Sequence, residues 1–235
     1  MKHLFFCPSL PADELELPEE EARHATGVLR LREGDVIGLL DGKGTRAEAV
    51  IIHADRKSCS VRITSRSSSA SERSASIHIA VSPTKQMERF EWMLEKCTEI
   101  GVDRITPLLT DRTERDKLRR DRLERVLVSA MKQSQRAWLP RLDEAITIKD
   151  LISAGIPQQR SFGWCEGAHK PFTQVYRPTE PAIILIGPEG DFTAEEAHGM
   201  IAQDFAAVSL GTARLRTETA AIAACTWMNF AQLPR

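Results

Sequence analysis

A continuous apolar run at 182–186 constrains the fold of this 235-residue chain more than any other feature. A strand that is apolar on both faces predicts a sheet covered on both sides. The run breaks into a glycine turn at 187–191, and a second apolar run at 206–210 breaks at Gly211. Each half has the order strand, glycine turn, helix, which is typical of a parallel α/β sheet. Ligands of such sheets bind outside the carboxyl ends of the strands, so these two loops are the candidate site.

The rest of the second half alternates strands and helices in the same way. The expected elements are a strand at 77–81, a helix at 87–100 closed by Gly101, a strand at 102–109, a helix around 123–131, a short helix at 151–152 and a strand at 161–165. Thr193 and Glu196 have the spacing of a capping box. Thr217 or Thr219 is expected to cap the last helix.

The first 64 residues predict a small β-rich domain. Short strands are expected at 4–6, 36–40, 47–52 and 60–63, with a helix at 20–29. Asp41-Gly42 between apolar runs is a hairpin signal, and the set suits a small barrel. The acidic segment 13–21 is interpreted as solvated surface. Serine dominates 65–76, which is interpreted as a linker, so the expected domains are 1–70 and 71–235.

Charge and cysteine usage narrow the function classes. The formal net charge of −1 gives no global basic field. Basic residues crowd 111–125 among acids, which favours a salt-linked solvated face, with a phosphate-tracking patch as the alternative. The five cysteines show no metal spacing, so no metal is expected. Without a signal peptide or transmembrane run, we expect a reduced cytoplasmic protein and no membrane partner.

The glycine loops match neither dinucleotide nor triphosphate motifs. Taken as a pair, however, the segments LIGPEG at 185–190 and LRTETA at 215–220 resemble the RsmE-type 16S rRNA (uracil-N3)-methyltransferases of the SPOUT superfamily. Further similarities to that family lie at His24 with 28–31, at 34–35, at 96–102, at 133–136 with Pro140, and at 210–211. The chain departs from the family pattern at Asp191, where a second glycine is usual, and at Leu4, where an arginine is frequent.

The resemblance implies the architecture and the activity. The fold would be α/β, with an N-terminal PUA-like β-barrel that helps to hold RNA, followed by a SPOUT-type domain with a C-terminal trefoil knot. The cofactor would be S-adenosyl-L-methionine, and the protein would be a homodimer. The substrate would be one uridine in the decoding region of 16S rRNA within the 30S subunit. Rival interpretations are methylation of tRNA or another rRNA site, and a non-catalytic ribosome-assembly factor.

Methylation of uracil at N3 requires removal of its proton and stabilisation of the resulting charge. Arg216 is expected to stabilise that anion, and Glu218 is a possible base. The alternative for Glu218 is a helix-start carboxylate favoured by the macrodipole. The cofactor is expected to contact Cys165, Glu166, Leu185, Ile186, Gly187, Glu189, Gly190, Leu210, Gly211, Leu215, Thr217 and Ala220. RNA is expected to contact His24, Arg30, Arg32, Lys85, Arg89, Gln133 and Arg136.

Overall fold

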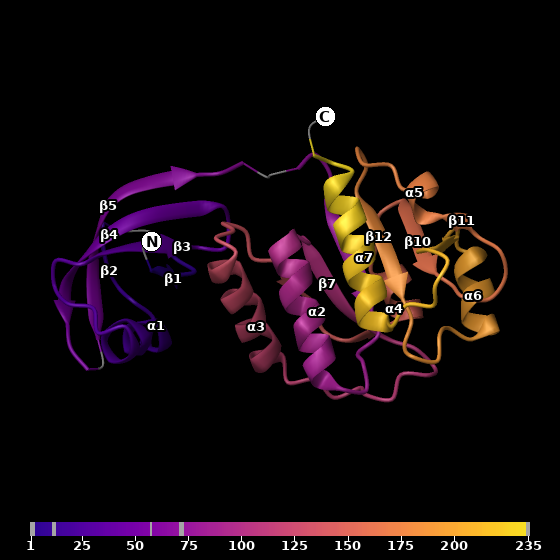
Figure 1. The fold of residues 1–235 in the computed structure, drawn as a ribbon, viewed down its shortest axis with the longest axis horizontal. Coiled ribbons are helices and arrows are strands. Elements are labelled where there is room, and N and C mark those ends of the chain that lie inside the picture. The colour runs from indigo at the N-terminus through magenta and orange to yellow at the C-terminus, as the bar shows by residue number, and fades with distance from the viewer. Residues whose placement is uncertain (1–2, 11–12, 57, 71–72, 234–235) are drawn as a thin grey trace. The chain divides into compact units, whose positions relative to one another are not determined.

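A computed structural model describes residues 3–10, 13–56, 58–70 and 73–233 (Figure 1). The chain divides into two compact units. The first contains Met1–Glu72 together with Val128–Leu139, and the second contains Arg73–Leu127 and Pro140–Arg235. The return of 128–139 to the first unit was not anticipated from the sequence, because its partners lie far away along the chain. One of them is Glu21, whose carboxylate is 2.6 Å from the Lys132 ammonium.

The first unit is built on a five-stranded sheet in the order β1-β3-β4-β5-β2. Its core gathers the inward side chains of alternating strand positions, among them Phe5, Ile37 and Val61. The strands are β1 (Leu4–Phe6), β2 (Glu14–Glu16), β3 (Val36–Leu40), β4 (Thr45–Ala54) and β5 (Cys59–Ser68), and the helices are α1 (Glu19–Arg23) and the π-type η1 (His24–Val28).

The predicted hairpin is confirmed, since β3 pairs antiparallel with β4 through the turn at Asp41 and Gly42. One Asp41 carboxylate oxygen accepts the backbone N–H groups of Lys43 and Thr45, at 2.7 and 2.9 Å. This is the local bonding that makes aspartate a turn residue.

One expectation for the first unit was wrong, and another was incomplete. β5 continues through 65–68, so the beginning of the serine-rich segment is strand and not linker. Its backbone finds partners along β4, and this pairing outweighs a composition unfavourable to a core. The acidic segment contains β2, whose Leu15 lies opposite Val61 while Glu14 and Glu16 remain exposed.

The second unit contains an eight-stranded sheet in the order β11-β13-β10-β12-β6-β7-β8, with β9 pairing β7, and every pair is parallel. The strands are β6 (Ile77–Val81), β7 (Arg104–Leu109), β8 (Arg141–Leu142), β9 (Ile146–Thr147), β10 (Gln159–Gly163), β11 (Lys170–Pro171), β12 (Ala182–Ile186) and β13 (Ala206–Ser209). The helices are α2 (Met87–Ile100), α4 (Ile148–Ser153), α5 (Phe172–Val175), α6 (Ala194–Ile201) and α7 (Thr217–Phe230), and α3 (Arg120–Gln133) begins in this unit and ends in the first.

Both faces of the central strands are covered, as the apolar run at 182–186 predicted. Every residue of β6 and β12 is buried. α2 and α7 lie side by side (Figure 1), and α7 packs on β6 and β12. Leu151 of α4 and Met200 of α6 join a separate core cluster with Leu185.

The helix boundaries follow local signals with one exception. Gly101 ends α2 with φ +113°, and Thr193 with Glu196 forms the predicted capping box of α6. The expected threonine cap of α7 was wrong, because Arg216 occupies the N-cap position and makes no side-chain cap hydrogen bond. The Thr217 hydroxyl is used elsewhere, as described below.

None of the helices in the part of the chain that the structure describes has the length and apolar character needed to cross a bilayer.

The charged segment at 111–125 forms ion pairs, as its first interpretation proposed. Arg120 pairs with Glu124 at 2.7 Å and Arg122 with Glu91 at 2.5 Å.

A buried polar chain crosses the parallel strands of the second unit. His78 Nε2 lies 2.7 Å from the Thr106 hydroxyl, which donates to the Asp143 carboxylate, and that carboxylate also pairs with Arg104 at 2.6 Å. Burial, followed by the charge of Arg104, lowers the pKa of His78 to about 4, although Asp143 opposes the shift. His78 is therefore neutral in the folded protein near neutral pH.

We expect this histidine to make stability depend on pH. Unfolded, it titrates near 6.5, so between pH 6.5 and 4 only the unfolded chain binds the proton. His78 therefore contributes about 3 kcal/mol to the free energy of unfolding above pH 6.5, and this contribution is lost as the pH falls towards 4. Urea unfolding should show that the free energy of unfolding falls less between pH 7 and pH 5 in His78→Gln than in the wild type. His53→Gln, which changes an exposed histidine, is the control. A fall in the free energy of unfolding as large in His78→Gln as in the wild type would contradict this account.

Candidate functional site

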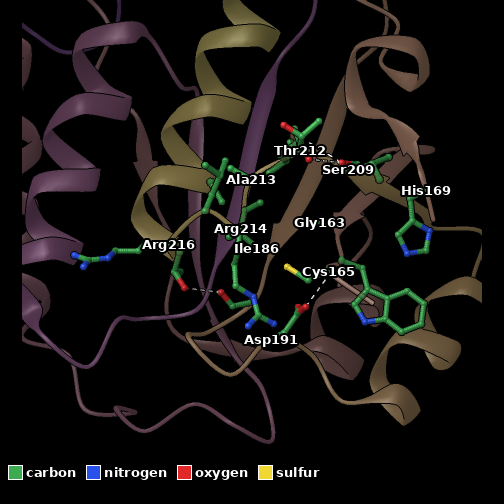
Figure 2. Close-up of a pocket in the computed structure, with 18 of the residues that line it drawn as sticks. Gly163, Cys165, His169, Ile186, Asp191, Ser209, Thr212, Ala213, Arg214 and Arg216 are labelled. Atoms are coloured by element: carbon green, nitrogen blue, oxygen red, sulfur yellow. Dashed lines mark hydrogen bonds between the residues drawn. The ribbon is translucent and has the colours of Figure 1, made fainter. Parts of the chain in front are cut away.

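The candidate site lies where three neighbouring parallel strands end. The loops at 163–169, 187–191 and 210–216 follow β10, β12 and β13, and β10 lies between the other two in the sheet. They enclose a cavity of about 820 Å³, shown in Figure 2. Its walls are Gly163, Trp164, Cys165, Gly167, Ala168, His169, Ile186, Gly187, Pro188, Glu189, Asp191, Val208, Ser209, Leu210, Gly211, Thr212, Ala213, Arg214, Leu215, Arg216, Thr217 and Ala220.

Two hydrogen bonds join the three loops. The Thr217 hydroxyl at the start of α7 donates to the Gly187 carbonyl oxygen at 3.0 Å. The backbone N–H of Cys165 donates to the Asp191 carboxylate at 3.0 Å. The loop after β12 is thus bonded both to the loop after β10 and to the start of α7.

Two glycines are required for different reasons. A Cβ on Gly187 would lie 3.2 Å from the ring and backbone of Phe192, so this glycine allows tight packing behind the loop. Gly211 has φ +140° and open space around it, so its role is the turn itself. The Ser209 hydroxyl reinforces that turn by donating to the Gly211 carbonyl at 2.8 Å.

The loop at 187–191 is also supported from outside the cavity. Glu189 accepts the backbone N–H of Lys85 at 3.0 Å, and the Arg112 guanidinium donates to the Gly190 carbonyl at 2.5 Å. Ser82 donates its backbone N–H to Ile186 at 3.0 Å. Segments after β6 and β7 therefore position this loop.

Aromatic side chains form the wall after β10. The rings of Trp164 and His169 stack with centroids 5.2 Å apart, and His198 meets Trp164 edge-on at 6.0 Å. His169 Nε2 lies 2.6 Å from the Glu166 carbonyl, which assigns its proton to that nitrogen. Contacts within this loop and with α6 therefore shape it.

Comparisons with known proteins agree with this arrangement. Residues 71–229 match the family model described as RNA methyltransferase domain, and residues 17–64 match the RNA methyltransferase PUA domain. A ribosomal RNA small subunit methyltransferase E from Synechocystis is 32% identical over 86% of this chain and 68% of its own length. The chain belongs to the ribosomal RNA small subunit methyltransferase E family.

Comparison with solved structures supports the same family. A probable rRNA-methyltransferase from Porphyromonas gingivalis is 40% identical, with TM-score 0.88, covering 97% of this chain and 98% of its own. A ribosomal RNA small subunit methyltransferase E from Neisseria gonorrhoeae, crystallised with S-adenosyl methionine, is 27% identical with TM-score 0.89, covering 98% of each chain. The expected α/β class and N-terminal PUA domain are confirmed.

The cavity brings together most of the residues predicted to bind the cofactor of this methyltransferase E family. Those that line it are Cys165, Ile186, Gly187, Glu189, Leu210, Gly211, Leu215, Thr217 and Ala220. Leu185 instead packs in the core, and Glu166 and Gly190 are exposed outside the cavity lining. Leu185 is excluded because alternate residues of a strand face opposite sides.

The two predicted catalytic residues lie differently. Arg216 lines the cavity and is exposed, and Figure 2 shows its side chain extending away from Cys165 and Asp191. Glu218 does not line the cavity. It is only 6% exposed in the first turn of α7, with one carboxylate oxygen 3.5 Å from the Arg89 guanidinium. The position matches the helix-start alternative.

The predicted RNA contacts divide between the units. His24, Arg30, Arg32, Gln133 and Arg136 belong to the first, and Lys85 and Arg89 to the second. His24, Arg30, Arg32 and Gln133 are exposed. Lys85 pairs with Glu114 at 2.9 Å.

Several wall residues were missed from the sequence, notably Trp164, His169 and Arg214. Their signal was positional, since Trp164 lies at the end of a predicted strand and His169 and Arg214 follow predicted strands, but residue type alone gave no reason to select them. Among the described residues, no cluster of three or more histidine, cysteine or acidic side chains is placed to hold a metal ion.

We expect the Thr217 hydroxyl to be a structural requirement of the site. In Thr217→Val the buried Gly187 carbonyl loses its donor, which should lower the free energy of unfolding by about 1–3 kcal/mol. Thr219→Val, at an exposed position two residues on, should change it by less than about 0.5 kcal/mol. Urea denaturation measures both, and equal effects would show that the bond is not needed.

Proposed function

We propose that this chain transfers a methyl group from S-adenosylmethionine to N3 of one uridine in the decoding region of 16S rRNA within the 30S subunit, in the cytoplasm. The observation that carries the proposal is the cavity at three strand ends, where a hydrogen bond from Thr217 to Gly187 joins the two family motifs. Relatives named ribosomal RNA small subunit methyltransferase E, one of them crystallised with S-adenosyl methionine, support it.

The cavity fits this cofactor in size and chemistry. About 820 Å³ lies within the range of sites that bury small molecules. Ile186, Val208 and Leu215 offer apolar contact for a base and ribose, and the glycine-rich loops expose backbone groups for hydrogen bonds. Oppositely charged side chains, Asp191 and Arg214, also line it.

When bound, S-adenosylmethionine supplies an electrophilic methyl group on a sulfonium. The residues of the chain then have to align this group with the target nitrogen and stabilise the charge that develops on the base. We assign the second task to Arg216, whose planar guanidinium suits the carbonyl oxygens of a uracil anion. Its exposure leaves it accessible to an incoming nucleotide.

We propose that Glu218 orients Arg89, and that it acts as a base only if that ion pair opens. Its other carboxylate oxygen is buried and has no hydrogen-bond partner within the described residues. A second partner would therefore be favourable, because an unsatisfied buried oxygen is costly. An RNA-contacting Arg89 held by Glu218 would couple substrate binding to the start of α7.

RNA binding is proposed for both expected domains, residues 1–70 as the PUA-like domain and 71–235 as the methyltransferase domain with its knot. Exposed arginines such as Arg30 and Arg32 suit phosphates, and RNA loops are recognised largely through phosphates and splayed bases. The target uridine would be flipped into the site, as enzymes acting on a base require.

We further propose a homodimer formed through α7. The exposed fractions of Trp227, Phe230 and Leu233 are 40%, 61% and 56%, and Trp92 of α2 is 48% exposed. Aromatic side chains of this size are enriched in the cores of interfaces. α7 carries mostly small, uncharged side chains, and such a surface favours a second copy of the chain as the partner.

Substitution of the exposed aromatic residues should therefore yield monomers. Trp227→Glu combined with Phe230→Glu places carboxylates in the proposed interface, and sedimentation should show a shift from dimer to monomer. Ile201→Glu, at an exposed apolar position on α6, should leave the dimer intact. A dimer that survives the double substitution would locate the interface elsewhere.

The activity itself is tested with labelled S-adenosylmethionine and purified 30S subunits or tRNA. We expect methyl transfer to 30S only, and mass spectrometry of the 16S rRNA should find one N3-methyluridine. Arg216→Ala should lower the rate about 10²–10³-fold while calorimetry still detects S-adenosylhomocysteine binding. Arg119→Ala, at an exposed arginine of the same unit, should leave the rate unchanged.

The other outcomes select the rival functions. Transfer to tRNA alone would change the substrate while keeping the chemistry. Failure to bind S-adenosylhomocysteine would favour a non-catalytic assembly factor.

A further inference from the structure

One part of the cavity carries charge of both signs. Asp191 and Arg214 come from different loops, after β12 and β13, and both line the cavity together with Cys165. Figure 2 shows the three side chains directed toward one another. Neither charged residue has a role in the proposed methyl transfer.

The Asp191 carboxylate is held in a defined place. Its backbone has φ +62°, a left-handed conformation that aspartate tolerates better than most residues. One carboxylate oxygen accepts the Cys165 N–H at 3.0 Å and the other accepts the Phe192 N–H at 2.8 Å. Each oxygen keeps a further lone pair, so the carboxylate can still accept from a ligand.

The Arg214 guanidinium lies close to the same point. Burial raises the pKa of the Cys165 thiol, Asp191 raises it further, and Arg214 lowers it. Both charges are thus near one sulfur atom. A carboxylate and a guanidinium on one cavity wall offer separate positions for a cation and an anion.

Another part of the wall is apolar. Ile186, Val208, Leu210, Leu215 and Ala220 surround space for a ring system without charge. A ligand complementary to the whole cavity therefore has an apolar heterocycle at one end and a zwitterion at the other. The amino-acid end of S-adenosylmethionine is such a zwitterion.

We propose that Asp191 and Arg214 form the subsite for that α-amino-acid end, with the carboxylate facing the ammonium group and the guanidinium facing the carboxylate. The inference rests on the proposed cofactor. It assigns these residues to affinity and positioning, whereas the apolar wall holds the nucleoside. Arg214 suits a carboxylate because its planar fork can donate two parallel hydrogen bonds.

Calorimetry with three ligands tests the subsite. S-adenosylmethionine and S-adenosylhomocysteine carry the amino-acid end, whereas 5′-methylthioadenosine has the same nucleoside thioether without it. Asp191→Asn and Arg214→Met should each lower the affinity for the first two ligands about tenfold, which is the effect of losing one charge-assisted hydrogen bond. Binding of 5′-methylthioadenosine should remain as in the wild type.

Asp204→Asn is the matched control, since Asp204 has φ +60° but is exposed outside the cavity. It should change none of the three affinities. Equal weakening of all three ligands would indicate a loop defect, and unchanged affinities would show no contact; either result overturns the subsite while leaving the cofactor assignment intact. A wild type that binds none of the three overturns the cofactor assignment and the subsite together.

Discussion

The hydrogen bond from the Thr217 hydroxyl to the Gly187 carbonyl is the contact on which the site depends. It joins the first residue of α7 to the end of β12, so the last helix and the central strand share one fixed point. Both partners are buried, which makes the loss of either one costly. Because the loops beside it are irregular backbone, this bond and the one between Cys165 and Asp191 replace the regular pairing that a strand would provide.

The fold explains why a methyltransferase site forms here. Parallel strands bring their carboxyl ends to one edge of the sheet, and β10 separates β12 from β13 in space although it precedes both in the chain. Three loops far apart in sequence thereby enclose one cavity. The charged side chains on its wall come from two of these loops, so their combination exists only after the sheet has formed.

Local patterns in the sequence were sufficient for most elements. The apolar run of β12, the glycine at the end of α2 and the capping box of α6 each act over a few residues, and each was predicted correctly. The first unit was less predictable, because β5 gains its pairing from β4 and continues into a serine-rich segment. Composition describes what a segment can bury, whereas strand pairing depends on what lies beside it.

The sequence by itself determined the alternation of strands and helices, the loops that form the site and, through two motifs, the family. Tertiary structure decided which side chains enter the cavity: Leu185 faces the core, Glu218 pairs with Arg89, and Arg214 joins Asp191 at the wall. The physical reason is that side-chain direction follows the pleat and the packing of neighbouring elements, and these depend on contacts between residues distant in the chain.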